Sequence, residues 1–370
     1  MPKVLIMDAK GVVTNGGFDV LKRHERYATV LKSLDQAAEL VIISKCRESE
    51  SINSSSLTIH CNKNILSFLL FSIQYLRNCD SNSLLVCGDP WESFLLTRLI
   101  QKLSKKRFPI QVQIHADVGA RRWIFLNFKN LIRFVALRPT LKGATQIRCV
   151  SAKQLKNIEN SIGKKLQNAV VIPVPIFVEP KLEDNQRKGN QQVVAFIGRI
   201  ERDRGLMRLL KIINLLNQSF IDLQVWIIGT GSQQKWLKSK LSKTKFADKV
   251  SFFGNISQDQ LFQLWPSIGC LLSLAPSESY GRAVREALIH GVPVVALRTS
   301  GLHELEDDFK DKGLYYIEEN NSNSEEVILR AFSSTVSDVA SRKLLNDLNH
   351  LPQMLANSWL DLLDNKEFQH

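Results

Sequence analysis

The sequence is poor in features that would place the chain across a membrane or outside the cell. Its longest apolar stretch, Ile65–Leu76, is interrupted by Ser and Gln and falls short of the roughly 20 residues that span a bilayer. The start, Met-Pro-Lys and a short apolar run that ends at Asp8, does not resemble a secretory signal. The six cysteines form no Cys-x-x-Cys pair and no zinc-type spacing. We therefore expect reduced thiols and a cytoplasmic protein.

Acidic residues are also scarce, but only in the first half. Residues 98–165 contain 16 Lys and Arg against two acids, Asp117 and Glu159. The net charge of +13 arises before residue 181, because the remainder holds 23 residues of each sign. Such a field favours nucleic acid, anionic lipid or a phosphorylated acceptor as partner, and a solvated basic surface without a partner is the alternative.

What the sequence does contain is an alternation of short apolar runs and amphipathic stretches, the pattern of parallel sheets with crossover helices. The polar segment 183–190 interrupts the series and has the composition of an interdomain linker. We therefore expect two α/β domains, as a chain of 370 residues commonly forms. The expected strands are Lys3–Met7, Leu40–Ser44, Leu84–Cys87, Ile110–Ile114, Gln146–Val150, Ala169–Ile172, Val193–Ile197, Leu223–Ile228, Val250–Phe253, Cys270–Leu274, Val292–Leu297 and Leu314–Ile317. The expected helices include Phe18–Leu34, Glu92–Leu103, Leu206–Asn217, Gln233–Ser242, Gln258–Trp265 and Arg282–His290.

The segment with the clearest chemical meaning runs from Ser277 to Leu288. It predicts a strand end, a loop and a helix that begins near Gly281, whose free N–H groups and dipole can bind a diphosphate. Glycine at this position lets the backbone approach a ligand closely. Glu278 in the loop and Glu286 in the second helical turn would flank this anion site and accept hydrogen bonds from sugar and ribose hydroxyls. Taken alone, each residue also fits an ordinary turn or an exposed helix position.

This segment resembles the signature of the family 4 glycosyltransferases, in which a Glu and seven further residues precede a second Glu. Other elements of that family follow in the same order over about residues 3–320, clearly in the second half and weakly in the first. In the second half they are Gly198-Arg199 with Arg204-Gly205, Gly229-Thr230-Gly231, Phe252-Phe253-Gly254 and Ser300-Gly301-Leu302-His303-Glu304. In the first half they are Asn15-Gly16-Gly17 and Ile114-His115-Ala116-Asp117.

The resemblance implies a GT-B fold: two Rossmann-like α/β domains that face each other across a cleft, with a C-terminal helix that returns to the first domain. The implied parts are an acceptor-binding domain, 1–178, a linker, 179–191, a donor-binding domain, 192–340, and a crossover helix, 341–370. The family's usual hinge sequence Pro-Asn-Gly-Val-Asp is replaced here by Pro173-Val174-Pro175-Ile176-Phe177.

The resemblance also implies roles for single residues, with His115, Arg199, Arg204 and Glu278 as the catalytic set. Arg199 and Arg204 would contact the donor diphosphate, and Arg204 stands where the family usually has Lys. Glu278 would contact the donor sugar and Glu286 the ribose, while His115 would lie near the transferred sugar. The remaining residues implied in donor binding are Gly16, Gly17, Gly198, Gly229, Gly231, Gly254, Asn255, Ser279, Tyr280, Gly281 and Arg282.

The chain has no Asp-x-Asp pair, which in many sugar transferases holds a metal. Two arginines and a helix N-terminus can stabilise the leaving diphosphate instead. The resemblance accordingly implies a reaction without metal or other cofactor and with retention of the anomeric configuration. A UDP- or GDP-sugar would be the donor and a hydroxyl of a glycan or glycolipid the acceptor, in cell-surface polysaccharide or lipopolysaccharide synthesis. A non-catalytic nucleotide-binding relative and a basic nucleic-acid-binding protein are the alternatives, although no nucleic-acid motif supports the second and we expect no such partner.

Residues 121–138 predict a contact with an anionic membrane surface. The segment 121–135 has helical period, with Arg122, Lys129 and Arg133 away from an apolar side. Trp123 and Phe134 are placed where aromatic rings meet a membrane interface. We expect reversible attachment to the cytoplasmic membrane face and a lipid-linked acceptor, and a core helix with a solvated basic edge is the alternative. The apolar side consists of Ile124, Phe125, Phe128, Leu131, Ile132 and Val135.

Overall fold

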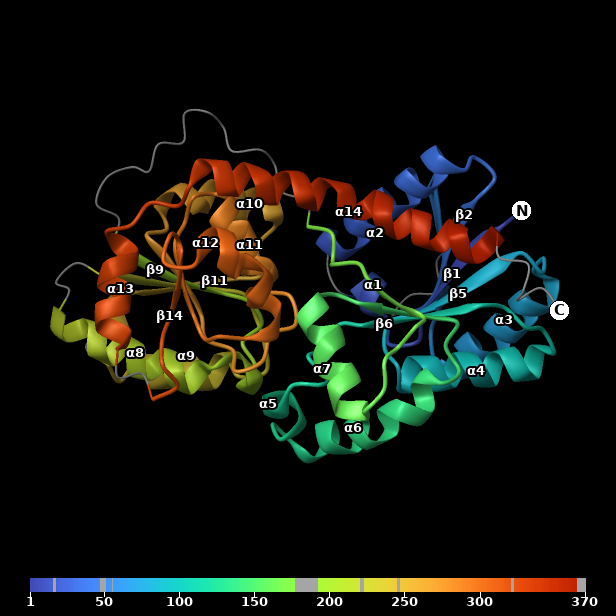
Figure 1. Ribbon diagram of the computed structural model, residues 1–370, viewed down its shortest axis with the longest axis horizontal. Helices are drawn as coiled ribbons and strands as arrows, with labels where there is room; N and C mark the ends of the chain where they lie inside the picture. Colours follow the sequence, from blue (N-terminus) through green and yellow to red (C-terminus); the bar gives the residue numbers. More distant parts are fainter. Residues whose placement is uncertain are drawn as a thin grey trace. The chain divides into compact units, whose positions relative to one another are not determined.

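The computed structural model describes residues 1–15, 18–46, 51–54, 56–176, 192–219, 223–244, 247–320 and 323–364. The chain forms two compact units, each built around its own sheet (Figure 1). Unit 1 comprises Met1–Pro175 and His350–His370, and unit 2 comprises Ile176–Asn349. The predicted linker 179–191 lies outside the described residues.

Unit 1 contains an eight-stranded sheet in the order β3-β4-β2-β1-β5-β6-β7-β8. All neighbours pair in parallel except β3 with β4. Central strands such as β5 are buried at every residue, as expected where helices cover both faces of a sheet. The strands are β1 (Lys3–Asp8), β2 (Glu39–Lys45), β3 (Ile52–Asn53), β4 (Leu57–Asn62), β5 (Ser83–Cys87), β6 (Ile110–Ile114), β7 (Gln146–Cys149) and β8 (Ala169–Val171). The helices are α1 (Val12–Asn15), α2 (Phe18–Leu34), α3 (Ile65–Asn78), α4 (Glu92–Ser104), α5 (Arg121–Ile124), α6 (Phe128–Leu141) and α7 (Ala152–Ile162).

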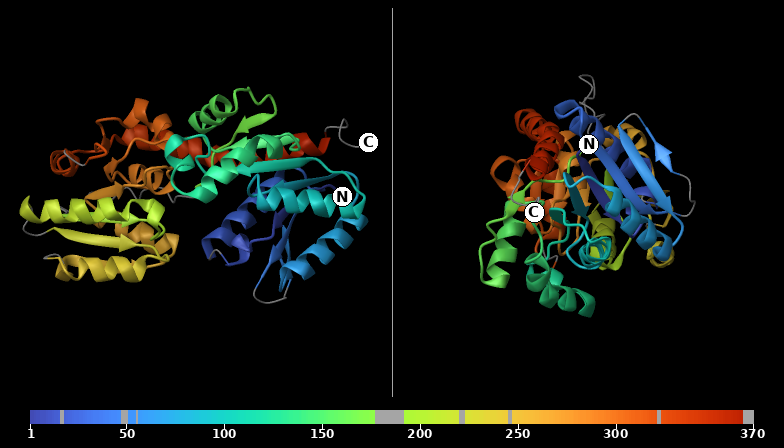
Figure 2. Two further views of the ribbon diagram at one scale, coloured as in Figure 1. Left: turned by 90° about the horizontal axis from the view of Figure 1, so that it is seen from below. Right: turned by 90° about the vertical axis from the view of Figure 1, so that its right-hand side faces the viewer.

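One face of this sheet packs against α3, α4, α6 and α7, and one hydrophobic core of unit 1 lies between them (Figures 1 and 2). Phe68 of α3, Phe94 of α4 and Leu137 of α6 anchor these helices to the apolar strand residues. Burial of such side chains is the main term that holds the layer in place, at about 1.5–3 kcal/mol each. The layer fixes where α4 begins and ends relative to the strands.

Unit 2 contains a parallel six-stranded sheet in the order β11-β10-β9-β12-β13-β14. One core joins its strands to α8, α9 and α13. The strands are β9 (Val193–Ile197), β10 (Gln224–Ile228), β11 (Val250–Gly254), β12 (Cys270–Ser273), β13 (Val294–Ala296) and β14 (Leu314–Tyr316). The helices are α8 (Leu206–Ser219), α9 (Gln234–Leu241), α10 (Gln258–Leu264), α11 (Arg282–Ile289), α12 (Glu306–Phe309), α13 (Ser324–Phe332) and the 3-10 turns η1 (Arg202–Arg204), η2 (Ala247–Lys249), η3 (Trp265–Ser267) and η4 (Ser300–Leu305).

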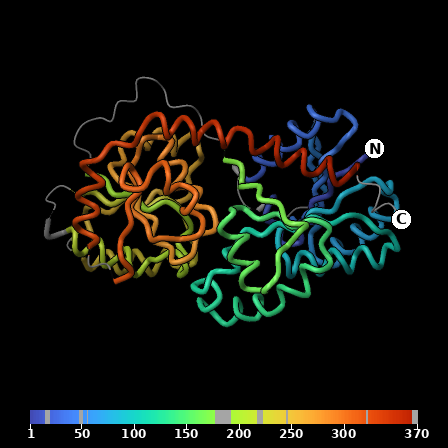
Figure 3. Tube along the Cα trace, viewed as in Figure 1, coloured from blue at the N-terminus to red at the C-terminus, as the bar shows by residue number. Residues whose placement is uncertain are grey.

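The long helix α14 (Asp338–Asp364) begins in unit 2 and ends in unit 1, as the trace in Figure 3 shows. In unit 2, Ser341 donates a hydrogen bond to the carbonyl of Leu288 at 2.7 Å. In unit 1, the indole Nε1 of Trp359 donates to Gln111 Oε1 at 2.9 Å, and its ring meets Tyr27 edge-on. The expected crossover segment 341–370 is therefore divided between the units at Asn349 and His350.

The twelve strands and the six helices expected from the alternating pattern are confirmed, with ends within two residues of those observed. The sequence reasoning missed β3 and β4, which extend the sheet beyond β2. The parts of the chain that the structure describes include no helix with both the length and the apolarity needed to cross a bilayer.

The prediction that all six cysteines are free is wrong for two of them. Cys46 and Cys61 form a disulfide, with their Cα atoms 5.2 Å apart. Because β2 and β4 are parallel neighbours with Ser44 opposite Cys61, their carboxyl ends bring the two thiols together. The other four cysteines are free and buried.

The predicted single helix over 121–135 is also wrong, because the chain breaks it into α5 and α6. The side chain of Asn127 caps α6 by accepting a hydrogen bond from the N–H of Asn130 at 2.8 Å. Trp123, predicted at a membrane interface, is buried and stacks on Trp91 with ring centroids 5.8 Å apart. Ile124 is buried as well. The exposed apolar residues of this region are Phe125, Leu126, Phe128, Ile132 and Val135.

Candidate active site

The carboxyl ends of the strands of unit 2 carry most of the predicted donor-binding residues. Gly281 is the N-cap of α11, with φ 75° and ψ 59°, a left-handed conformation that favours glycine. A Cβ atom there would lie 2.6 Å from Leu302 Cδ2, so a side chain at this position would require the Leu302 side chain to shift. The N-cap glycine has no side chain to cap the helix, and the first N–H groups and positive dipole end of α11 can meet an anion.

Arg285 fixes the loop before α11, a role that the sequence reasoning missed. Its guanidinium is buried and donates to the carbonyl of Tyr280 and, at 2.9 Å, to that of Gly301. It also lies over the Tyr280 ring, 3.8 Å from the centroid, and Glu304 Oε2 is 3.4 Å away. Burial lowers the pKa of Arg285 from its ordinary value. This one cation therefore ties the loop before α11 to η4.

The same two segments touch through their backbones. The N–H of Gly301 donates to the carbonyl of Glu278 at 2.8 Å. A Cβ atom on Gly301 would lie 2.2 Å from the backbone N of Tyr280, so only glycine allows this approach. Ser279 and Tyr280 are buried, whereas Arg282 faces solvent. The predicted donor residues Ser279 and Tyr280 thus form a packed support for the helix start.

Arg204 and Glu278, which the sequence predicts on the diphosphate and the sugar, contact each other. Arg204 NH1 donates to Glu278 Oε2 at 2.6 Å, and both side chains are partly exposed. The approach depends on Gly205, since a Cβ atom there would lie 2.1 Å from the carbonyl oxygen of Leu274. The arrangement places a cation and a carboxylate together beside the start of α11.

Glu286 is buried in the second turn of α11, so it is not the exposed helix residue that was the alternative. Gln258 Nε2, on α10, donates to Glu286 Oε1 at 3.2 Å, and Arg282 NH2 lies 3.6 Å from the same oxygen. Gln258 was not predicted, because nothing in the sequence links the two helices. A buried carboxylate with polar partners can accept hydrogen bonds from a hydroxyl pair.

The predicted glycines of unit 2 lie at the ends of three adjacent strands, β9, β10 and β11, and fall into two groups. Gly229 and Gly231 are packing glycines, because a Cβ atom on either would lie 2.0 Å or 2.3 Å from a backbone oxygen. Gly198 and Gly254 have φ of 148° and 71°, and no atom lies within 4 Å of the position of a Cβ. The second pair therefore borders open space.

Arg199 and Asn255, next to these two glycines, are exposed. The carboxylate of Glu201 accepts hydrogen bonds from the backbone N and the hydroxyl of Ser232, at 2.8 and 2.6 Å. These two bonds, with the nearby charge of Arg199, lower the pKa of Glu201. Glu201 thus connects the loop after β9 to the glycine loop after β10.

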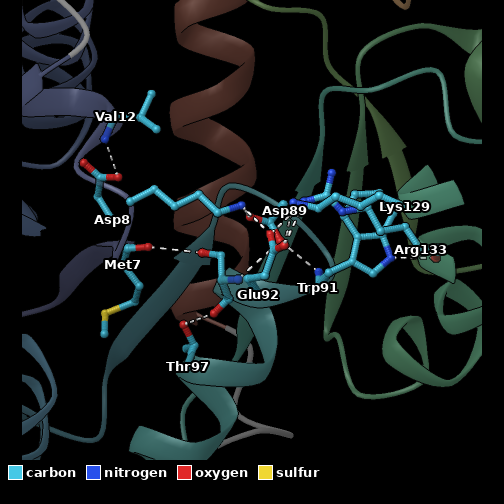
Figure 4. A network of polar contacts seen from close by, with 11 residues as sticks. Met7, Asp8, Val12, Asp89, Trp91, Glu92, Thr97, Lys129 and Arg133 are labelled. Carbon is cyan, nitrogen blue, oxygen red and sulfur yellow. Dashed lines mark hydrogen bonds and ion pairs between the residues drawn. The ribbon is translucent and has the colours of Figure 1, made fainter. Parts of the chain in front are cut away.

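In unit 1, the predicted residues Gly16 and Gly17 lie outside the described residues. The turn that leads to them is built by Asp8, at the end of β1. Its carboxylate accepts a hydrogen bond from the N–H of Val12 at 2.8 Å (Figure 4). It also accepts from the N–H of Val13 and from the hydroxyl of Ser44, each at 2.8 Å. His115 follows the end of β6, and its Nε2 lies 3.1 Å from Gln113 Oε1. Asp8 was not predicted, although a buried Asp at a strand end is a signal for such a turn.

Figure 4 also shows a charged network beyond β5. Lys10 donates to Asp89 at 2.8 Å and to Glu92 at 2.6 Å, and Arg133 donates to both oxygens of Glu92 at 2.8 and 2.9 Å. Desolvation opposes ionisation of Glu92, but the bonds from Lys10 and Arg133 lower its pKa to about 2. Arg133 also lies over the Trp91 ring. Arg133, predicted to face a membrane, is therefore already paired within unit 1.

The described residues contain no group of three or more His, Cys, Asp or Glu side chains that could hold a metal ion. The charged groups at the start of α11 are Glu278 with Arg204 and Glu286 with Arg282, beside the glycine N-cap.

Comparison with known proteins assigns the second half of the chain. Residues 178–344 match the sequence model of the family described as "Glycosyl transferases group 1". This chain carries a group 1 glycosyltransferase domain. The resemblance read from the sequence is thereby confirmed at the level of this family, and the motif residues from Gly198 to Glu304 all fall within the matched domain.

Relatives of the glycosyltransferase domain support the same assignment. The chain is 23% identical to the uncharacterized glycosyltransferase YqgM of Bacillus subtilis (strain 168) over 195 residues, which cover 52% of this chain and 53% of that protein. The chain thus spans about half the length of this curated relative.

Solved structures are similar over both units. Sucrose-phosphate synthase from Thermosynechococcus elongatus superposes with a TM-score of 0.80 at 14% sequence identity. The match covers 98% of this chain and 99% of the synthase chain. Anabaena HepE in complex with UDP and glucose has a TM-score of 0.70 at 16% identity and covers 96% and 98%. The glycosyltransferase domain therefore belongs to a chain with the GT-B fold, as predicted.

Proposed function

We propose that this chain is a retaining glycosyltransferase that moves a sugar from a UDP- or GDP-sugar to a hydroxyl of a glycan or glycolipid, without a metal. The observation that carries the proposal is the cluster on unit 2: the start of α11 at Gly281, the Arg204–Glu278 pair and the buried Glu286. Helix N-termini and arginines favour diphosphates, and buried carboxylates favour hydroxyls. HepE, a structural relative, was solved with UDP and glucose.

Arg199, Arg204 and the N–H groups of α11 would hold the donor diphosphate. Gly198 and Gly254 border open space that would admit the nucleotide, and Glu286 would accept the ribose hydroxyls. Gly16, Gly17 and His115 of unit 1 would approach the phosphates and the transferred sugar. These assignments extend the family resemblance to the positions matched in this chain.

The reaction needs stabilisation of the charge that develops on the departing nucleoside diphosphate. As the bond between the anomeric carbon and the phosphate oxygen breaks, its electron pair remains on the diphosphate. The acceptor oxygen then bonds to the same face of the sugar, and its proton passes to the leaving phosphate. The fixed positive groups near α11 would lower the barrier most where this charge is greatest.

The Arg204–Glu278 pair has a consequence for donor binding. At 2.6 Å, NH1 of Arg204 is engaged by the carboxylate, so a donor phosphate would have to use the remaining donors of the guanidinium. Glu278 would thereby orient Arg204 as well as contact the sugar. A lysine, which the family usually has at this position, offers no such fork.

A thermal-shift screen with UDP, GDP, ADP and a short DNA duplex tests the proposal. A ligand that binds only the folded state stabilises it by mass action and so raises the melting temperature. At a ligand concentration of 100 times the Kd, the free energy of unfolding increases by about 2.7 kcal/mol. We expect UDP or GDP to stabilise the protein and DNA to have little effect. Stabilisation by DNA alone would replace the proposal with nucleic-acid binding. Stabilisation by UDP or GDP without transfer from any nucleotide sugar would indicate a non-catalytic relative.

We also propose that the acceptor is lipid-linked or otherwise anionic and that the protein works at the cytoplasmic membrane face, in cell-surface polysaccharide or lipopolysaccharide synthesis. Residues 121–138 support this through the exposed Phe125, Phe128, Ile132 and Val135, with Arg122 and Lys129 nearby in the chain. One structural relative is WaaG, a glycosyltransferase involved in lipopolysaccharide biosynthesis. Vesicle flotation of the wild type and of a Phe125→Ser, Phe128→Ser double variant tests this contact. If both proteins float equally, residues 121–138 do not make the membrane contact.

A further inference from the structure

The exposed face of α4 combines leucines with cations. Leu95, Leu99 and Leu103 are 57%, 46% and 47% exposed, and their spacing of four residues puts them on one side of the helix. Arg98 and Lys102, which are also exposed, lie between them on the same side. Single exposed leucines are ordinary, but a stripe of three beside two cations is not explained by the fold.

A basic pocket lies at the C-terminal end of this face. Its volume is about 920 Å³, and its lining includes five cations and no carboxylate. Within the described part of the chain none of the five forms a salt bridge, and the contacts of Arg98 and Lys106 are to backbone carbonyls at 3.4 and 3.5 Å. The five cations are Arg98, Lys102, Lys105, Lys106 and Arg107. Mutually repelling charges kept unpaired around a hollow indicate a site for an anion.

The backbone at the pocket supports this interpretation. Lys105 is the C-cap of α4 and has φ 59° and ψ 25°, a left-handed conformation that usually belongs to glycine. A basic side chain is thus held at a position where glycine, which has no Cβ atom, would be less strained. Such outliers gather at ligand sites, because the surrounding structure retains them for function.

The pocket is separate from the proposed donor and acceptor residues. It lies beside Ile110, the first residue of β6, whereas His115 follows the last. α4 runs between the two edges of the sheet over 13 residues, a length of roughly 20 Å. A ligand in the pocket would therefore leave the carboxyl edge of the sheet free.

We infer that the outer face of α4 binds an anionic membrane, with a phosphate-bearing lipid headgroup in the pocket and the leucine stripe in the apolar part of the interface. The leucines decide between a lipid and a free phosphate compound, since a soluble anion would gain nothing from them. α3, which packs beside α4 on the same face of the sheet (Figure 2), exposes Leu66 and Leu70 and contains no acidic residue. Basic and apolar groups together are what an anionic interface attracts.

This site lies outside residues 121–138 and does not depend on the proposed transfer chemistry. Flotation of the full chain with phosphatidylcholine vesicles, with and without phosphatidylglycerol, tests it at low salt. The pocket variant combines Lys102→Ser with Lys105→Gly. Glycine suits the left-handed backbone at 105, so the fold should be kept while the charge is lost. Lys235→Ser with Lys240→Ser on α9 removes the same charge elsewhere and serves as the matched control.

The wild type should bind vesicles that contain phosphatidylglycerol and should not bind vesicles of phosphatidylcholine alone. Each cation near an anionic surface contributes roughly a factor of five, so the pocket variant should bind roughly 25-fold more weakly and the α9 control almost as the wild type. Equal loss in both variants, or equal binding to neutral vesicles, would overturn the proposal.

A second comparison separates lipid from other anions. Leu95→Ser with Leu99→Ser should weaken vesicle binding, whereas the same changes at the exposed Met207 and Leu329 should not. Full vesicle binding by the Leu95/Leu99 variant would refute the membrane assignment. An affinity of the protein for glycerol 3-phosphate or duplex DNA equal to its affinity for anionic vesicles would also refute it. UDP binding, measured in parallel, should remain unchanged in all four variants.

Discussion

Replacing Glu286 by Gln tests the ribose contact while keeping the size and burial of the side chain. Glu286 is 5% exposed and has Gln258 Nε2 at 3.2 Å from Oε1, a contact that a Gln oxygen can preserve. The variant therefore loses the charge but little packing. Hydrogen bonds to a charged group contribute about 1.5–3 kcal/mol, so the Kd for the nucleotide should rise roughly 10- to 150-fold.

The measurement is calorimetric titration with the nucleotide that stabilises the wild type and with its 2′,3′-dideoxy form. The substitution should weaken the first and leave the second unchanged, because the second has no hydroxyls for the carboxylate. Gln258→Ala is the control: it removes the neighbour of Glu286 but keeps the carboxylate, so it should cost less. If both nucleotides lose affinity equally in Glu286→Gln, the carboxylate acts on something other than the ribose.

Three further changes probe the rest of the account. Arg199→Ala should lower kcat by about 10²–10³ and change nucleotide Kd far less, as expected of a group that stabilises transition-state charge, and equal losses in both would contradict that role. Arg285→Met should lower the free energy of unfolding, measured in urea, by about 1–3 kcal/mol for each carbonyl left unpaired at Tyr280 and Gly301, and an unchanged midpoint would mean that the loop is held by other contacts. Because the folded-state pKa of Glu92 is depressed from 4.5 to about 2, its ion pairs stabilise the fold above about pH 4.5 and this contribution is lost as pH falls toward 2. Glu92→Gln should remove that slope, by no more than about 1 kcal/mol since the side chain is half exposed, and a slope that persists would belong to other carboxylates.

The sequence predicts most of the architecture because its apolar runs report buried parallel strands directly. β4 was missed because only half of its residues are buried, with the partly buried His60 and Cys61 between Ile59 and Asn62. The break between α5 and α6 follows from a local cap at Asn127, which interrupts an otherwise continuous helical period. The disulfide between Cys46 and Cys61 depends on strand order, which spacing along the chain does not encode.

The site was predictable at positions where the backbone geometry requires glycine, because the sequence shows the glycine. Gly281, Gly301 and Gly205 each stand where a Cβ atom would collide, and the motif records that constraint. Arg285 could not be found in this way, because its partners are backbone carbonyls, one in the loop before its own helix and one in η4. Asp8 also acts on backbone groups, the N–H groups of the following turn, but its place at a strand end is a signal that the sequence contains. The contacts of Arg285 become visible only when the loops are placed.

The most direct test of the central claim is the anomeric configuration of the product, read by NMR for a reaction run in excess chelator with the nucleotide sugar that the protein accepts. The account predicts transfer that continues without metal and gives a product of the same anomeric configuration as the donor. An inverted product, or activity that disappears with chelator and returns with magnesium or manganese, would contradict it.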